Sequence, residues 1–145
     1  FGATRDDDDV ADPEISPADV DALVFYMRSL APPRPRPIDA VVEADGAFLF
    51  DRIGCTDCHT TGFVSPDGVV AYTNLLLHQV AADGSAGVAS GNAMPLEFRT
   101  PPLWGLGQSA PYMHDGRSFT IEDAIARHDA EGAASRRAFE DLTAE

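Results

Sequence analysis

The chain has 145 residues, enough for one domain of ordinary size, and it carries a net charge of −14 with ten arginines and no lysine. So acidic a chain argues against binding to the phosphate backbone of nucleic acid and to anionic membrane surfaces. Apolar residues make up 44% of the chain, which is enough for a core. No apolar run is long enough to span a bilayer.

The first segment is predicted to be a polar tail followed by a helix. Residues 6–9 are four consecutive aspartates, for which we expect a solvated tail. A calcium site is the weaker alternative, because the run lacks the spaced oxygens and turn glycine of a known loop. Ser16 and Pro17 are typical of a helix start, and the apolar residues that follow keep a helical period as far as Leu30.

A proline-rich stretch marks the predicted domain boundary. Four prolines between residues 32 and 37 end the helix and favour an extended spacer. We therefore divide the chain into residues 1–37 and a main domain of residues 38–145. Because Phe1 is not a start methionine and the helical pattern after Ser135 stops unfinished, we expect a piece of a longer polypeptide.

The main domain is predicted to contain helices separated by a long loop region. Helices are expected over residues 38–53, 120–128 and 135–142, and Gly54 is expected to end the first of them. Residues 60–103 are rich in Gly, Pro, Ser, Thr and Asn and show little strand pattern. A loop of this length needs a large bound group to order it.

Cys55, Cys58 and His59 form a Cys-x-x-Cys-His motif directly after the first of these helices. This is the attachment pattern of c-type haem, in which each thiol adds to one vinyl group and the histidine binds iron. Zinc would need a second pair of ligands at close spacing, and a thioredoxin-type dithiol would need a βαβ setting. The sequence therefore predicts one covalent haem c, with His59 as an axial ligand.

The second axial ligand decides what the iron can do. On the helix predicted for residues 120–128, which Thr120 is expected to cap, His128 shares a face with Ile121 and Ile125. We therefore favour His128 as this ligand. The alternatives are Met113, Met94, His78, His114 and an open site.

Four further residues are predicted to surround the haem. Arg99 and Arg117 suit the haem propionates, because guanidinium groups form paired charge-assisted hydrogen bonds with carboxylates. Their alternative is an ordinary place on the surface. Trp104 and Tyr112 are expected in the pocket wall, where each also offers a donor to a propionate. We include Met113 among the cofactor-binding residues as the second candidate ligand.

Several stretches resemble a known family. Residues 46–59 resemble the first helix and haem anchor of class I cytochromes c. Residues 98–106 and 110–117 resemble the second haem domain of bacterial dihaem cytochrome c peroxidases, and look closest to the dihaem oxidoreductase (thiol oxidoreductase) branch. The similarity continues through residues 21–30, 72–78 and 120–125.

The resemblance implies an all-α, cytochrome c-like fold of a few short helices, with long loops wrapped around one covalent haem. It also implies that a ligand follows the His114-Asp115-Gly116 turn, and His128, 14 residues after His114, is at the matching place. The family carries two haem motifs, whereas this sequence has one. Residues 21–30 then correspond to the last helix of a preceding, absent haem domain, and the final helix is cut short.

Two protein ligands on iron leave no position for peroxide, so we expect a low-spin, bis-histidine haem that transfers one electron. Its partners are predicted to be redox proteins with basic surfaces and other haem domains or subunits, since opposite charge speeds encounter. Covalent haem implies the periplasm or the extracellular face of a bacterium. The alternative is a peroxidase (EC 1.11.1) with an open or switchable haem, and a third possibility is a purely structural haem.

Overall fold

The computed structural model describes residues 13–81 and 86–143, and the aspartates at residues 6–9 lie outside them. The chain divides into two compact units, Phe1–Ala31 and Pro32–Glu145. The division falls at the start of the proline-rich stretch, whereas the sequence placed it at the end of that stretch. The prolines therefore belong to the larger unit.

The smaller unit contains helix α1, Pro17–Ser29. It begins as predicted, because Ser16 caps it by accepting a hydrogen bond from the Asp19 amide at 3.2 Å. Its large apolar side chains are exposed, among them Phe25 at 74% and Met27 at 59%. The apolar period along this helix therefore marks a surface that the unit itself does not cover.

The larger unit opens with helix α2, Ala40–Arg52, whose N-cap is Asp39. The Asp39 carboxylate accepts a hydrogen bond from the Val41 amide at 2.8 Å. Helix α2 ends as predicted before Gly54, which has a φ of +81°. That left-handed conformation favours glycine and turns the chain directly into a 3-10 turn, Cys55–Asp57.

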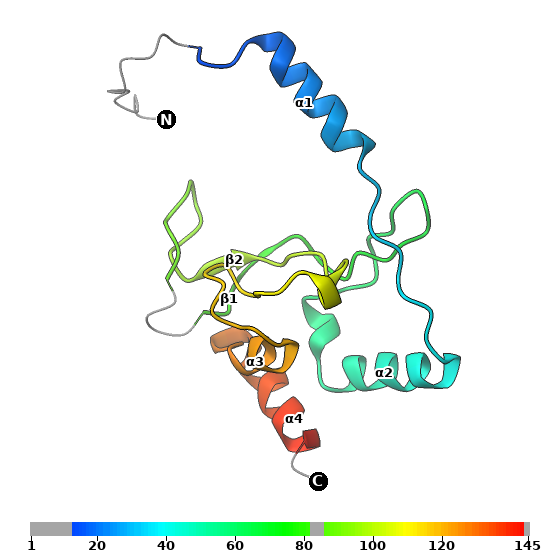
Figure 1. The fold of residues 1–145 in the computed structure, drawn as a ribbon. Coiled ribbons are helices and arrows are strands. Elements are labelled where there is room, and N and C mark those ends of the chain that lie inside the picture. Colours follow the sequence, from blue (N-terminus) through cyan, green and yellow to red (C-terminus); the bar gives the residue numbers. More distant parts are fainter. Residues whose placement is uncertain (1–12, 82–85, 144–145) are drawn as a thin grey trace. The chain divides into compact units, whose positions relative to one another are not determined.

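The long loop region contains a small antiparallel sheet that the sequence did not predict. Strand β1, Leu77–Gln79, pairs with strand β2, Glu97–Arg99, and His78 lies opposite Phe98. Three-residue strands are too short to show an alternating pattern. The described chain is therefore four α-helices, one two-stranded sheet and long loops (Figure 1).

Helix α3 is shorter than predicted and spans Ile121–Ala126. Thr120 caps it as expected by accepting a hydrogen bond from the Asp123 amide at 3.0 Å. His128 lies beyond the end of α3, so the helix face on which we placed it does not extend that far. A 3-10 turn, Ala130–Gly132, then leads into helix α4, Ala133–Thr143, which packs against α3 (Figure 1).

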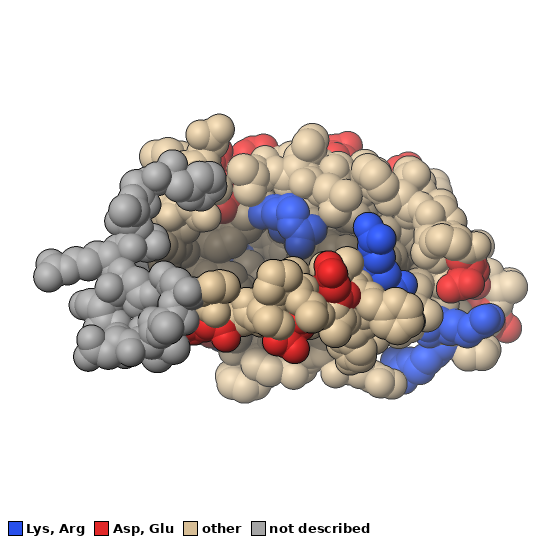
Figure 2. Space-filling model, turned by 90° about the horizontal axis from the view of Figure 1, so that it is seen from above, with Lys and Arg blue, Asp and Glu red and all other residues tan. Residues whose placement is uncertain are grey.

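Among the described residues few apolar side chains are buried, and the buried ones belong to the loops. They are Val69, Ala71 and Ala81. Acidic side chains lie at several separate places on the face shown in Figure 2, with arginines among them. None of the helices in residues 13–81 and 86–143 is long and apolar enough to cross a membrane.

Candidate haem site

The Cys-x-x-Cys-His motif forms one compact turn. The amides of Cys58 and His59 both donate to the carbonyl of Cys55, the latter at 2.9 Å. Gly54 starts this turn close to helix α4, since a Cβ there would lie 3.1 Å from Ser135 Oγ. Both thiols are free and partly exposed. The turn therefore presents two thiols and an imidazole from five consecutive residues, as haem attachment requires.

The surroundings of both thiols raise their pKa values. Burial raises the pKa of Cys55, and the charges of Asp57 and Cys58 raise it further, against an opposing backbone hydrogen bond. Burial, Glu131 and Asp57 raise the pKa of Cys58. Redox dithiols have lowered thiol pKa values, so this environment does not match a thioredoxin-type site.

A metal ion held by side chains alone is also poorly supported. Within residues 13–81 and 86–143, no group of three His, Cys, Asp or Glu side chains is arranged to hold one. Structural zinc sites use four such ligands. The donor set of two thiols and nearby imidazoles therefore fits haem c better than zinc.

One ring nitrogen of His59 is hydrogen-bonded to the backbone, and the other is left to bind a metal. Its Nδ1 lies 2.9 Å from the carbonyl oxygen of Tyr72, so Nδ1 carries the proton and Nε2 keeps a lone pair for a metal. Burial lowers the pKa of His59, opposed by the Tyr72 hydrogen bond, and the charges of His128 and His78 lower it further. A neutral imidazole with its second nitrogen anchored is the usual state of a metal-binding histidine.

His128 is held in the same way. Its Nδ1 lies 2.9 Å from the Ala124 carbonyl oxygen, and its amide donates to the Ile125 carbonyl at 3.0 Å. These bonds turn the chain at the end of α3 and leave Nε2 of His128 free. Its charge also contributes to the lowered pKa of His59, after the larger effects of burial and of the Tyr72 hydrogen bond.

The other candidate histidines have different surroundings. His78 uses both ring nitrogens, with Nδ1 3.0 Å from Glu131 Oε2 and Nε2 2.8 Å from Asn74 Nδ2. His114 stacks on Phe98 with ring centroids 4.3 Å apart. Neither arrangement prepares a nitrogen to bind iron.

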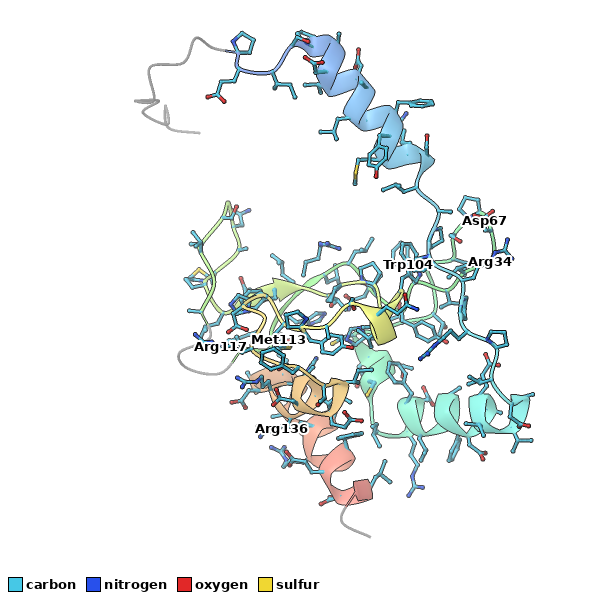
Figure 3. The ribbon with its side chains drawn as sticks, in the orientation of Figure 1. Arg34, Asp67, Trp104, Met113, Arg117 and Arg136 are labelled. Atoms are coloured by element: carbon cyan, nitrogen blue, oxygen red, sulfur yellow. The ribbon has the colours of Figure 1, made fainter. Side chains whose placement is uncertain are left out.

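The candidate methionines lie on loops. Met94 is 64% exposed, and Met113 has a φ of +67° at the His-Asp-Gly turn. Figure 3 labels Met113 and Arg117 on the segment before α3. Both methionines stay alternatives to His128.

The predicted pocket residues are placed by hydrogen bonds to the backbone. The Trp104 indole donates to the Val70 carbonyl at 2.8 Å, and the Tyr112 hydroxyl donates to the Leu106 carbonyl at 2.7 Å. Their donors are thus already used, which leaves the pocket wall as their predicted role. Trp104 lines a cavity of about 230 Å³ that is otherwise mainly apolar.

The two predicted propionate partners are exposed. Arg117 forms an ion pair with Asp115 at 3.1 Å, and Arg99 lies in strand β2. Their contact with a propionate stays a prediction. A second cavity, of about 410 Å³, is lined by Arg34, Asp67 and Tyr72 among others (Figure 3).

Sequence reasoning missed the groups that hold the ligands in place. The Tyr72 and Ala124 carbonyls are backbone atoms, so no side-chain pattern reports them. Glu131, which bonds to His78, lies 53 residues from it in the chain. The sequence signal that could have pointed to Glu131 is its position three residues after His128.

Comparisons with known proteins show the family to which the chain belongs. Residues 2–145 match the family described as "Di-haem oxidoreductase, putative peroxidase". The chain belongs to this family and is therefore a haem redox protein. It is 31% identical over 104 residues to the methylamine utilization protein MauG of Methylorubrum extorquens, covering 68% of this chain and 28% of that protein. No solved structure matches.

Proposed function

We propose that this domain transfers single electrons through one low-spin c-type haem, with His59 and His128 as its axial ligands. The observation that carries the proposal is the matched state of these two histidines. Each imidazole donates from Nδ1 to a backbone carbonyl at 2.9 Å, which leaves Nε2 free to bind iron. His78 is engaged through both nitrogens and His114 is stacked on a phenyl ring.

When bound, the haem supplies a ferric/ferrous couple. Cys55 and Cys58 would hold it to the chain, and His59 and His128 would bind the iron. A second imidazole in place of a methionine thioether stabilises the ferric state, so we propose a comparatively low potential.

We propose that the domain works beside other redox centres. It aligns with little more than a quarter of the length of MauG, which supports a role inside a larger assembly. The net charge of −14 favours partners with basic surfaces. Covalent haem attachment favours the bacterial periplasm or the extracellular face.

The second candidate is a peroxidase-type enzyme, and the description of the family favours it. In that case one axial position would be open, or would open when a neighbouring centre is reduced. His128 would then be a displaceable ligand or no ligand at all.

Visible and electron paramagnetic resonance spectra of the purified holoprotein separate the two candidates. We expect a low-spin ferric spectrum that cyanide, peroxide and carbon monoxide do not change. High-spin iron or ready binding of these ligands would favour the peroxidase.

The ligand itself is tested by His128→Met, with His114→Met as the matched control on an exposed histidine. We expect His128→Met to raise the midpoint potential and to add a sulfur–iron charge-transfer band, and His114→Met to change neither. An unchanged spectrum for His128→Met would remove His128 as the ligand.

A further inference from the structure

A chain of hydrogen bonds joins the turn after His128 to strand β1. Glu131 lies in that turn, and its two carboxylate oxygens accept from two consecutive residues of β1. Oε1 accepts from the Gln79 amide at 2.7 Å, and Oε2 lies 3.0 Å from His78 Nδ1. The Asp129 amide also donates to the Val80 carbonyl at 3.0 Å. The residues directly after His128 are therefore hydrogen-bonded to β1 at two points and to Val80, the next residue, at a third.

The direction of these hydrogen bonds follows from the groups that take part. The Leu76 amide donates to Asn74 Oδ1 at 2.9 Å, so Asn74 Nδ2 faces His78. An amide nitrogen is a donor, and His78 Nε2 must therefore accept. The proton of neutral His78 then sits on Nδ1 and is donated to Glu131. Every partner is satisfied when His78 is neutral and Glu131 is ionised.

The same segment of chain holds His59. The Tyr72 carbonyl accepts from His59 Nδ1, and Thr73 is tied to Thr60 by hydrogen bonds of 3.0 and 2.9 Å. Residues 72–80 thus contact the surroundings of His59 at one end and those of His128 at the other. Glu131 closes the second contact, and its charge also reaches Cys58, whose pKa it raises after the larger effect of burial.

We propose that Glu131 is a positioning residue that fixes His128 relative to His59, acting through His78 and Gln79 of strand β1. The inference rests on the proposed function, because it takes His128 as the distal ligand. Glu131 is itself exposed, so its ion pair adds little stability. Glu131 acts instead on the position of the turn that follows His128. The orientation of an axial ligand depends on such hydrogen bonds around it.

Glu131→Gln is the direct test in the holoprotein. The amide keeps one acceptor for Gln79 but presents a donor to the protonated His78 Nδ1, so the chain of hydrogen bonds no longer closes. His78→Phe breaks the same chain from the other side while keeping a planar ring. The control is Glu122→Gln, which removes the same charge from an exposed position on α3.

The readout is the ligand state of the ferric iron. For Glu131→Gln and His78→Phe we expect the population without the distal ligand, measured by cyanide binding and high-spin absorption, to rise on the order of tenfold. Added free imidazole should restore the low-spin spectrum. Glu122→Gln should resemble the wild-type protein.

Three results would overturn the inference, and they differ. If His128→Ala gives high-spin iron while Glu131→Gln and His78→Phe stay low-spin, the positioning role is wrong and the proposed function stands. If His128→Ala itself stays low-spin, His128 is not the ligand and both fail. A loss of helical circular dichroism that imidazole does not reverse would show a general structural role for Glu131 instead.

Discussion

A Cβ atom placed on Gly132 would lie 3.0 Å from the Cβ of His128 and 3.4 Å from its Cδ2. Such a contact is tighter than packed side chains normally allow, and one of the two residues would have to shift. The turn Ala130–Gly132 thus passes close against the proposed distal ligand. The absence of a side chain at residue 132 allows that approach.

Gly132→Ala should therefore disturb His128. We expect a loss of about 1–2 kcal/mol in the free energy of unfolding and an altered ferric spectrum, because overpacking displaces neighbouring atoms. Urea unfolding and visible absorption of the holoprotein measure both. Gly46→Ala in α2 is the control: no atom lies within 4 Å of its added Cβ, and helix propensity favours it by up to about 1 kcal/mol. Equal behaviour of the two variants would contradict the prediction.

The covalent link is tested by replacing the thiols. Cys55→Ser or Cys58→Ser should leave one thioether, and the double variant should release haem on denaturation, because only thioethers resist it. The pyridine haemochrome spectrum and haem staining of denaturing gels measure this. Thr56→Ala keeps both thiols inside the motif and should retain covalent haem. Staining that persists in the double variant would refute attachment through these residues.

Thr73 is 1% exposed and organises the loop beside the site. Its hydroxyl donates to the Thr100 carbonyl at 2.7 Å and accepts from the Leu75 amide at 2.9 Å. Thr73→Val keeps the shape but leaves both groups without their partner, so we expect a loss of about 2–4 kcal/mol. Chemical unfolding measures it. Thr61→Val, at an exposed position, should change stability little, and similar losses for both variants would contradict the argument.

Phe50 packs between His59 and Tyr72, with ring centroids 6.3 and 5.9 Å away. Phe50→Leu should remove the aromatic contacts and cost about 0.5–1.5 kcal/mol. The midpoint of urea unfolding gives the change. Phe48→Leu on the same helix is the control, since Phe48 is 63% exposed. A larger effect at Phe48 would show that the packing around His59 is not as described.

The His78 hydrogen bond lowers the pKa of Glu131, helped by the Gln79 amide and, to a lesser extent, by the charge of His78, against the opposing effect of burial. A carboxyl whose pKa is lowered by folding stabilises the folded state above its unfolded pKa, near 4.5. That contribution is lost as the pH falls through the folded pKa. A small difference in Tm between the wild-type protein and Glu131→Gln should therefore be present at pH 6 and shrink below about pH 4.5. A Tm difference that grows on acidification would contradict this prediction.

Local interactions made several elements predictable. Ser16 and Thr120 cap the helices that they were expected to start, and Gly54 ends α2 through its left-handed backbone. Each of these signals acts between residues within one helical turn, so it can be recognised in the sequence without the tertiary structure. The end of α3 was missed because the His128 ring bonds back to Ala124 and its amide to Ile125, which the apolar period does not reveal.

The spacing of Cys55, Cys58 and His59 by itself predicted the haem, because haem attachment depends on residues that are neighbours in the chain. The arrangement around the second histidine was decided only by the tertiary structure. Tyr72 meets His59 across 13 residues and Glu131 meets His78 across 53. Contacts over such separations exist only after the chain has folded, when residues 72–80 bond to His59 at one end and to Asp129, next to His128, at the other.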